Sequence, residues 1–532
     1  MGSSYSKPSD ERSNTATASQ LEKSTGSSHL STPHHHAADR LARIQAEANH
    51  AAGRWSASSP RSDRHQAHIS QEAIKDWDSK AFESDVAKLA TLTLHNADLA
   101  TSLHRRQAEI SNQHIYSHTI PSEAGPVTNQ RSSGRCWLFA TTNVIRLEVI
   151  KSLKLKEFEL SQSYLSFYDK LEKSNYFLEN MIELADRPLD ERVVGFLKTA
   201  PTNDGGQWDM AVNLLEKYGV VPKHVFPESY SSSYSSKINW LVTLKLREYA
   251  LELRELKKTA AARLARSSVP PQEQRTAVYK VLRQRKDEQM EEVYRIMAIS
   301  LGSPPKPDAE FTFEYHDKDG KFHSLKATPR SFYKDYTASF DAKSMCSLVN
   351  DPRRSPDQLI TIDRLGNVWG GQPVLYVNTT MSAMRDAVVK SIKAGQPVFF
   401  GCDVGKFSET KSGIMDTGLF DYELAFNIKL GLSKADRIEL GESSMTHAMV
   451  ITGVHINAKG EVERYRVENS WGEDNVGDKG YMVMTDRWFQ EYCYQVVTKK
   501  EFMPSKLWDL FKRGVDDKTV VLPPYDPFGA LA

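Results

Sequence analysis

The stretch Gln130–Trp137, QRSSGRCW, contains the residues that decide the fold. Cys136 opens an apolar segment that runs to Leu153 and predicts a buried helix with the cysteine at its N-terminus. A thiol there gains thiolate character, because a helix N-terminus carries partial positive charge. Gly134 permits close backbone approach, and the Gln130 amide can converge with the Cys136 backbone N–H. Two such donors would stabilise charge developing on a carbonyl oxygen, so the stretch predicts a nucleophile with an oxyanion hole.

Two further stretches, each at one end of a predicted strand, carry groups that complement a cysteine nucleophile. His447 lies in MTHAMV, at the start of an apolar strand, and Asn469 lies in ENSWG, at the end of another. A histidine in this position is more often a satisfied core group than a base. With an asparagine nearby, however, the amide can fix the ring tautomer so that the other ring nitrogen faces Cys136. Trp471 would shield that hydrogen bond from water.

The pattern outside these motifs divides the chain into a helical half and a β-rich half. Helices are predicted for Ser161–Glu172 and for Asp209–Tyr218, the second closed by Gly219. Residues 237–300 show three- and four-residue apolar spacing broken at Pro270-Pro271, which predicts an inserted helical hairpin. After about residue 310, short apolar runs predict strands, listed here: Val374–Val377, Val398–Phe400, Ala448–Val454, Arg464–Glu468 and Tyr481–Met484. The fold class is therefore α+β, with a site expected where the two unlike halves meet.

Bulk composition excludes several classes of protein. The 532 residues are 39% hydrophobic and 26% charged, with a net charge of +1, so no global attraction to nucleic acid or to an anionic surface is expected. No apolar run is long enough to span a membrane. The four cysteines, Cys136, Cys346, Cys402 and Cys493, form no CxxC pair, which speaks against a zinc ribbon or a disulfide scaffold and favours a reducing, cytoplasmic compartment. No cofactor and no metal are predicted.

Residues 1–70 are polar and predict a disordered extension. The start MGSSYSK fits an N-acylation pattern with Gly2 as acceptor, and a chance match in a Ser-rich tail explains it equally well. One acyl chain would give only weak membrane association. A mitochondrial leader is the other reading, weakened by the acidic Asp10, Glu11 and Glu22.

The order Gln130, Cys136, His447, Asn469 resembles the papain superfamily. The separation of Cys136 and His447 is about twice the usual 130–150 residues, as the inserted hairpin and its flanks would require. Longer stretches are similar to the bleomycin hydrolase/aminopeptidase C family, namely TNQRSSGRCWLFATTN (128–143), GCDVGKF (401–407), GIMDTGLFDYE (413–423), THAMVITGV (446–454), VENSWGED (467–474) and DPFGALA (526–532). Ser133 stands where secreted papain-like enzymes have a second cysteine, which agrees with a disulfide-free protein.

This resemblance implies more than a reaction class. It implies a papain-like two-lobed fold and a homohexamer whose sites face an inner chamber. It also implies an aminopeptidase that hydrolyses the amide of bleomycin and homocysteine thiolactone. The C-terminal tail would lie in its own cleft, with the Ala532 carboxylate facing the substrate's ammonium and with Ala530 and Leu531 along the approach. Gly205-Gly206 would bind an extended peptide through the backbone, and a simple turn before the next helix is compatible with that role.

The resulting domain prediction has five parts: a disordered extension (1–70), a helical lobe (71–236), a helical insertion (237–305), a β-rich lobe (306–500) and a tail returning to the site (501–532).

Other hydrolase classes fit the sequence less well. Asp416-Thr417-Gly418 resembles an aspartic peptidase motif, but no second copy occurs, and that chemistry needs two aspartates. Neither HExxH nor GxSxG is present. The alternative from another class is a hexameric nucleic-acid-binding protein that uses the basic insertion; scattered aromatics there favour an ordinary solvated face. Cys402 is expected to pack on a strand rather than to react.

Overall fold

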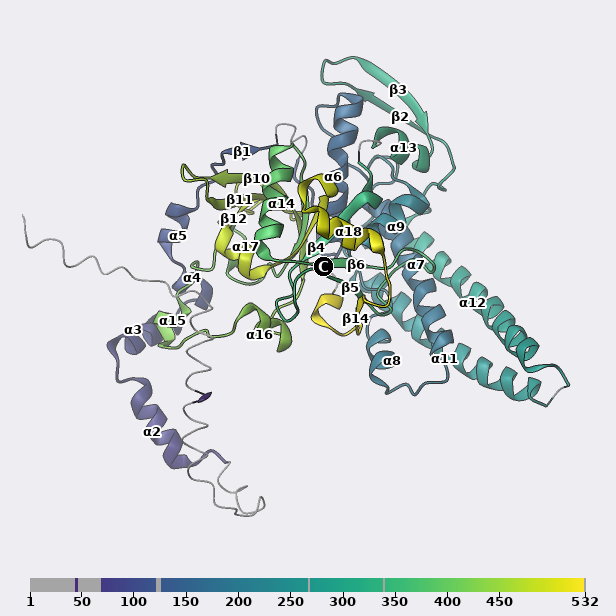
Figure 1. Ribbon diagram of the computed structural model, residues 1–532, viewed down its shortest axis with the longest axis horizontal. Coiled ribbons are helices and arrows are strands. Elements are labelled where there is room, and N and C mark those ends of the chain that lie inside the picture. The colour runs from purple at the N-terminus through teal and green to yellow at the C-terminus, as the bar shows by residue number, and fades with distance from the viewer. Residues whose placement is uncertain (1–43, 46–67, 121–125, 267, 338–339, 531–532) are drawn as a thin grey trace, which may run out of the picture. The chain divides into compact units, whose positions relative to one another are not determined.

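The computed structural model describes residues 44–45, 68–120, 126–266, 268–337 and 340–530 (Figure 1). All elements named below belong to one compact unit, Ile69–Lys429 with Lys434–Ala532. The predictions made for Gly2 and for Leu531 and Ala532 lie outside the described residues, as does nearly all of the 1–70 extension.

The helical half is built around α6 (Cys136–Leu153), which starts at the predicted nucleophile and is buried along almost all of its length. It is followed by α7 (Gln162–Glu183), α8 (Arg192–Leu197) and α9 (Trp208–Tyr218). Helix α7 begins where predicted, capped by the Ser161 hydroxyl, but continues well beyond Glu172. Helix α9 ends at Gly219, where φ is +73° and a Cβ would lie 2.1 Å from the Pro329 carbonyl oxygen. Only glycine fits this stop, as the sequence predicted.

The predicted helical hairpin is confirmed. It consists of α11 (Ser236–Leu264) and α12 (Pro271–Leu301), which lie side by side in Figure 1, with Pro271 in the first turn of α12. The buried stripe Leu246, Tyr249 and Leu253 of α11 faces inward. Both helices pack on α7, so this apolar stripe is what joins the insertion to the helical half.

The β-rich half contains one mixed sheet in the strand order β14-β5-β6-β4-β13-β7-β10-β11-β12-β9-β8, with β1 pairing on β10. Its strands are β1 (His118–Thr119), β4 (Met345–Val349), β5 (Gln358–Ile362), β6 (Leu375–Asn378), β7 (Val398–Cys402), β8 (Ser408–Glu409), β9 (Ile414–Met415), β10 (His447–Ile456), β11 (Val462–Glu468), β12 (Tyr481–Thr485), β13 (Cys493–Lys499) and β14 (Val520–Leu522). All five predicted strands are present. The antiparallel register places His447 opposite Cys402 and Val450 opposite Glu468, so the predicted site residues lie on neighbouring central strands.

Smaller elements surround this core. A separate hairpin joins β2 (Phe311–His316) to β3 (Phe322–Ala327). The remaining helices are α2 (Gln71–Ala81), α3 (Asp85–Leu94), α4 (Leu99–Leu103), α5 (Arg106–Ser111), α10 (Tyr230–Ser233), α13 (Pro329–Tyr336), α14 (Met381–Lys393), α15 (Tyr422–Phe426), α16 (Lys434–Glu439), α17 (Asp486–Tyr492) and α18 (Ser505–Arg513). None of the helices in the described ranges is long and apolar enough to cross a bilayer.

The predicted succession of a helical half and a β-rich half is therefore confirmed. The sequence did not predict that helices such as α14 and α17 interrupt the β-rich half.

Candidate active site

Cys136 occupies the first position of α6, directly after Arg135, and its side chain is buried at the junction with β10. Burial raises the pKa of the Cys136 thiol to about 11, against the effect of backbone N–H groups of Ala448, Trp137 and Cys136 itself, which lower it. The Ala448 contact shows that the sulfur lies against the residue next to His447. Helix α6 thus delivers the thiol to the start of the strand that carries the histidine.

His447 and Asn469 form the hydrogen bond that the sequence predicts. His447 Nε2 lies 2.9 Å from Asn469 Oδ1, and the Ser470 backbone N–H donates to the same oxygen at 2.7 Å. Because that oxygen only accepts, Nε2 must carry the hydrogen, and Nδ1 is left as the unprotonated nitrogen of the neutral ring. The Trp471 ring lies 4.9 Å from the His447 ring, centroid to centroid, and covers this pair.

Burial lowers the pKa of His447 to about 4, and the hydrogen bond to Asn469 raises it. Burial alone therefore favours a neutral thiol and a neutral imidazole. Moving the proton from sulfur to the ring creates two opposite charges side by side, and each then compensates the other for lost solvation. The site is suited to an ion pair and unsuited to either charge alone.

Gln130 lies at the same junction. Its backbone N–H donates to the Ser470 carbonyl at 2.8 Å, and its Oε1 accepts from the Ser470 hydroxyl at 2.6 Å. Its Nε2 donates to the Ser133 carbonyl at 2.6 Å. An amide nitrogen carries two hydrogens, so the second can face an oxyanion. The structure thus brings Gln130, Cys136, His447 and Asn469 together from three separate segments of the chain.

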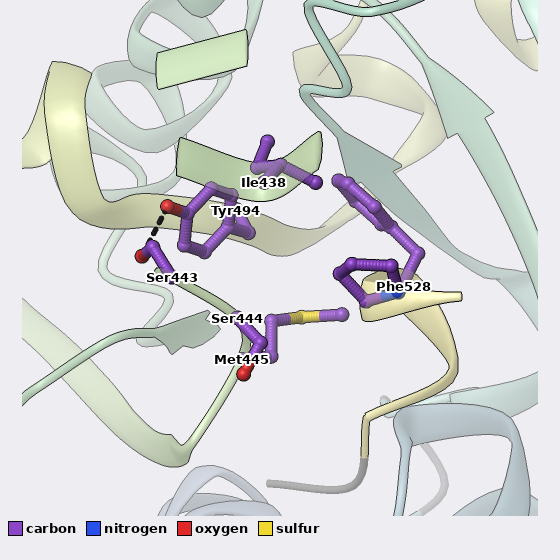
Figure 2. Close-up of a pocket in the computed structure, with 7 residues that line it drawn as sticks. Ile438, Ser443, Ser444, Met445, Tyr494 and Phe528 are labelled. Carbon is purple, nitrogen blue, oxygen red and sulfur yellow. Dashed lines mark hydrogen bonds between the residues drawn. The ribbon is translucent and has the colours of Figure 1, made fainter. Parts of the chain in front are cut away.

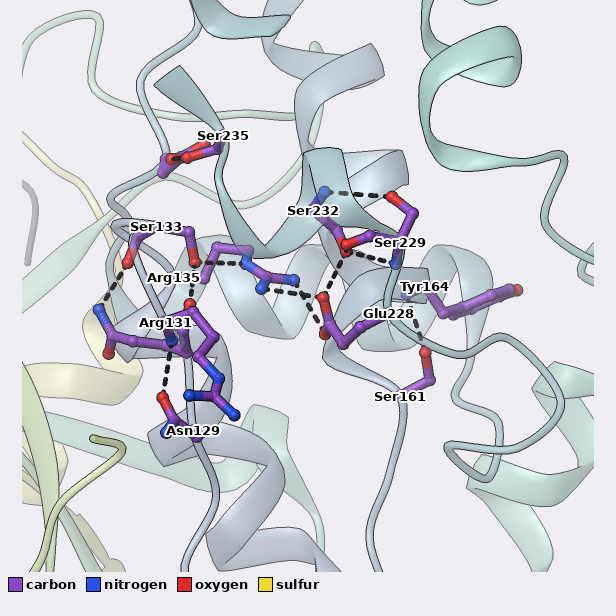
Figure 3. Close-up of polar contacts among 12 residues, drawn as sticks. Asn129, Arg131, Ser133, Arg135, Ser161, Tyr164, Glu228, Ser229, Ser232 and Ser235 are labelled. Carbon is purple, nitrogen blue, oxygen red and sulfur yellow. Dashed lines mark hydrogen bonds and ion pairs between the residues drawn. The ribbon is translucent and has the colours of Figure 1, made fainter. Parts of the chain in front are cut away.

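An ion pair of the buried Arg135 with the partly buried Glu228 was missed by the sequence analysis (Figure 3). Arg135 Nη2 lies 3.0 Å from Glu228 Oε2, and Arg135 Nε donates to Ser133 Oγ at 2.8 Å. Ser133 Oγ in turn donates to the Gln130 carbonyl at 2.6 Å. The guanidinium therefore fixes the loop that carries the predicted oxyanion donor. The available signal was a charged residue directly before a helix that is buried from its first residue.

A second missed group is Asp204, which supports the same loop from the other side. Its carboxylate pairs with Lys170 at 2.8 Å and accepts from the Gly134 N–H at 3.3 Å, and its carbonyl accepts from Trp137 Nε1 at 2.7 Å. Burial opposes ionisation, but the Lys170 ammonium and the Ser235 hydroxyl outweigh it and hold the pKa of Asp204 far below its usual value. Asp204 is therefore an anion at neutral pH and positions residues on both sides of Cys136.

A third missed pair links the nucleophile's helix to the strand of Asn469. Arg146 of α6 contacts Glu468 of β11 at 2.6 Å, with side chains only 3% and 5% exposed. Asn143 donates to the same carboxylate at 2.9 Å. Glu468 directly precedes Asn469, so this pair sets how α6 and the end of β11 lie against each other.

Gly205-Gly206 directly precedes Gln207 and α9, as the turn interpretation requires. A Cβ on Gly206 would lie 2.4 Å from the Trp137 ring, so packing against the residue after Cys136 explains this glycine without a substrate. Gln207 Nε2 donates to the Ala530 carbonyl at 2.7 Å. The chain near its C-terminal end therefore lies next to the predicted substrate wall.

Two groups that were set aside in the sequence are structural. Cys402 is fully buried on β7, and burial raises the pKa of its thiol well above the usual value, as expected for a packed cysteine. Asp416 accepts from the Asn112 amide at 2.7 Å and from the Gly418 N–H at 2.9 Å, which makes it the centre of a turn.

Known proteins share both this sequence and this fold. The profile of the Peptidase C1-like family matches residues 68–529. The chain belongs to that family. It is 43% identical over 475 residues to cysteine proteinase 1, mitochondrial, of Saccharomyces cerevisiae, covering 88% of this chain and 94% of the relative. It is also 43% identical to bleomycin hydrolase of Mus musculus over 444 residues, covering 82% and 92%.

The solved structures agree. The crystal structure of PepW from Lactobacillus rhamnosis matches with a TM-score of 0.80 and 39% identity, over 88% of this chain and all of that one. This member of the Peptidase C1-like family is therefore a cysteine peptidase with a papain-like fold, of the bleomycin hydrolase/aminopeptidase C type.

Proposed function

We propose that this peptidase is an aminopeptidase that removes residues from the N-terminus of peptides and aminoacyl amides through a thioacyl intermediate on Cys136. The observation that carries the proposal is the junction of Cys136, Gln130 and the hydrogen-bonded His447–Asn469 pair beside the Ala530 segment. The family resemblance connects that arrangement to exopeptidase activity. No cofactor is needed for this chemistry.

In the proposed reaction, His447 Nδ1 holds the proton of the thiol while Cys136 Sγ attacks the carbonyl carbon. The Cys136 N–H and the Gln130 amide bind the oxyanion. His447 then gives its proton to the departing amine, which leaves a thioester. A water attacks the thioester with the same imidazole as base, which releases the carboxylic acid product and regenerates the thiol. A strained thiolactone is attacked by the same sulfur, so homocysteine thiolactone hydrolysis belongs to the proposal.

The test compares fluorogenic aminoacyl amides with their N-acetylated counterparts. We expect only the compounds with a free amine to be cleaved well. Equal cleavage of both would reject exopeptidase specificity while leaving cysteine peptidase chemistry intact.

We also propose that the C-terminal tail limits substrate binding before the scissile bond, with the Ala532 carboxylate facing the substrate ammonium. The Gln207–Ala530 hydrogen bond supports it. Deleting Ala530–Ala532 should shift activity towards internal cleavage, and unchanged selectivity would reject the tail's role.

A homohexamer is proposed on the resemblance and on exposed apolar side chains. Helices α2 and α3 have no buried residues in the single chain and expose Trp77, Leu89 and Leu92. We expect light scattering to give the mass of six chains, whereas a mass near 60.1 kDa, that of one chain, would contradict it.

The alternative is a hexameric nucleic-acid-binding protein that uses the insertion. Arg263, Arg266, Arg275 and Lys280 are exposed near the hairpin's turn, whereas Lys257 pairs with Asp186 and Arg285 with Glu252. Salt-dependent binding that survives Cys136→Ala, with no hydrolysis by the wild type, would favour it.

For localisation, we propose the cytoplasm, with a mitochondrial or acyl-anchored pool through residues 1–70 and Gly2; mass spectrometry of the native N-terminus tests it.

A further inference from the structure

The segment after β14 is attached to the β-rich half by a buried charged group. Arg353 Nη2 lies 2.9 Å from Asp526 Oδ1. The same guanidinium binds Asp351 twice, through Nε and Nη2, each at 2.9 Å. The side chains of Arg353 and Asp526 are 12% and 10% exposed, and that of Asp351 is fully buried. Asp351 thus orients Arg353 with two parallel hydrogen bonds, and Arg353 presents a directed donor to the segment.

Asp526 joins this guanidinium to the shape of the segment. Its Oδ1 also accepts the Phe528 backbone N–H at 2.9 Å, and its carbonyl accepts the Gly529 N–H at 2.7 Å. Position 529 requires glycine, because a Cβ there would lie 2.6 Å from the Pro524 carbonyl oxygen. Residues 526–529 therefore form a rigid turn whose position is set by Arg353.

Phe528 is buried at the same place, where it forms one side of a small pocket (Figure 2). Its side chain is 2% exposed and meets the Tyr376 and Tyr494 rings edge-on, with centroids 6.4 and 6.1 Å away. Ile438, Met445 and Tyr494 line the pocket together with Phe528 itself. Met445 lies two residues before His447, and Ser443 of the same loop bonds the Tyr494 hydroxyl at 2.6 Å. These contacts of Phe528 therefore hold the tail against the loop that leads into β10, the strand that carries His447.

The third contact is the Gln207–Ala530 hydrogen bond beside Gly206. Asp526, Phe528 and Ala530 are therefore each held by a contact with another part of the chain. Neither Arg353 nor Phe528 is one of the residues that carry out the proposed reaction.

We propose that Arg353 and the contacts of the buried Phe528 are the anchor of the C-terminal segment and thereby determine how strictly the enzyme acts from the substrate's N-terminus. This inference rests on the proposed aminopeptidase function. Arg353 and Phe528 are positioning residues: loosening them releases the tail and opens the cleft to blocked or internal substrates.

The first experiment measures hydrolysis of N-acetylated relative to free aminoacyl amides. Arg353→Gln and Phe528→Ala should each raise that ratio roughly tenfold or more, because each loses an interaction that holds the tail. Arg353→Lys should give an intermediate ratio. In a protein lacking residues 530–532, Arg353→Gln should add nothing. A ratio unchanged by both substitutions, or an equal change in the truncated protein, would overturn the anchor.

The second experiment does not depend on peptidase activity. In full-length Cys136→Ala protein, release of the C-terminal residues by an added carboxypeptidase is followed by mass spectrometry. Arg353→Gln should accelerate release, whereas Arg385→Gln, a matched control that breaks the Arg385–Asp486 pair at 3.4 Å between α14 and α17, should not. Unchanged release with Arg353→Gln would overturn the anchor whatever the specificity. Faster release with an unchanged hydrolysis ratio would overturn the role of the anchor in specificity, whereas the deletion of Ala530–Ala532 tests the role of the tail itself.

Discussion

The buried ion pairs at the junction of the two halves differ from the exposed pair Lys258–Glu255 on the helical hairpin. At the junction, Arg146–Glu468 and Lys170–Asp204 are almost fully buried and join segments distant in sequence. On the hairpin, Lys258–Glu255 is 80% and 69% exposed and joins residues three apart on one helix. Removing one partner of a buried pair leaves a charge without solvent, whereas water replaces the partner of an exposed one.

This difference shows which charges position the active site. The junction pairs place α6, the loop before Cys136 and the end of β11 relative to one another. The pair Lys258–Glu255 lies within one helix that already has an apolar stripe against α7, whereas the hairpin's Lys286 pairs with the buried Glu179 of α7 and resembles the junction pairs. The number of ion pairs in a region therefore does not show whether they position the active site. Their burial and their separation in the sequence do.

The largest expected effect is at Glu468. Glu468→Ala leaves Arg146 buried without its carboxylate and should lower the free energy of unfolding by about 3–5 kcal/mol. Chemical denaturation measures it. Replacing both residues by apolar ones of similar size serves as the control and should restore most of the loss. A loss below about 1 kcal/mol for Glu468→Ala would show that the pair does not hold the junction.

A smaller loss of stability is expected on substitution of Asp204, and it should change how the free energy of unfolding depends on pH. Since its folded-state pKa is lowered, its contribution is fully present above the unfolded pKa of about 4 and is lost as the pH falls below that value. Asp204→Asn should cost about 1.5–3 kcal/mol near neutral pH and should flatten the acid side of the stability curve. An acid limb as steep as that of the wild type would contradict the ion pair with Lys170.

Asn469→Ala should affect catalysis more than folding. Without the amide oxygen, the protonated ring loses a hydrogen bond, so the pKa of His447 falls further. The alkaline limb of the kcat/KM profile should move to lower pH, and kcat/KM should fall about tenfold. A profile with lower height but unchanged shape would show that Asn469 does not act through the imidazole.

The smallest effect is expected on the hairpin. Glu255→Ala removes an exposed i,i+3 partner and should change the free energy of unfolding by less than about 0.5 kcal/mol, with no change in activity. The same denaturation experiment measures it. A cost similar to that of Glu468→Ala would abolish the distinction between the two regions.

What the sequence predicted follows the same division. Helix α6, the stop at Gly219, the Pro270-Pro271 break and the central strands are encoded by local periodicity, so they were predictable. Cys136, His447 and Asn469 were recognised because each lies in a distinctive motif. The ion-pair partners Glu228, Asp204 and Glu468 were not predicted, because nothing local distinguishes a carboxylate that will face a distant cation from one that will face water. The extension of α7 was missed for a related reason: it contains buried polar residues whose partners lie elsewhere in the chain. Lys173 donates to the Asn203 carbonyl, and Glu179 pairs with Lys286 of α12.

The measurement that tests the central claim most directly is the pH dependence of Cys136 alkylation by iodoacetamide, in the wild type and in His447→Ala. If the thiolate forms together with the imidazolium, the wild type should react rapidly on the acidic side of neutrality. His447→Ala should react only at alkaline pH, because burial raises the pKa of the isolated thiol to about 11. A wild-type rate that rises only at alkaline pH, and that the loss of His447 does not change, would contradict the ion pair.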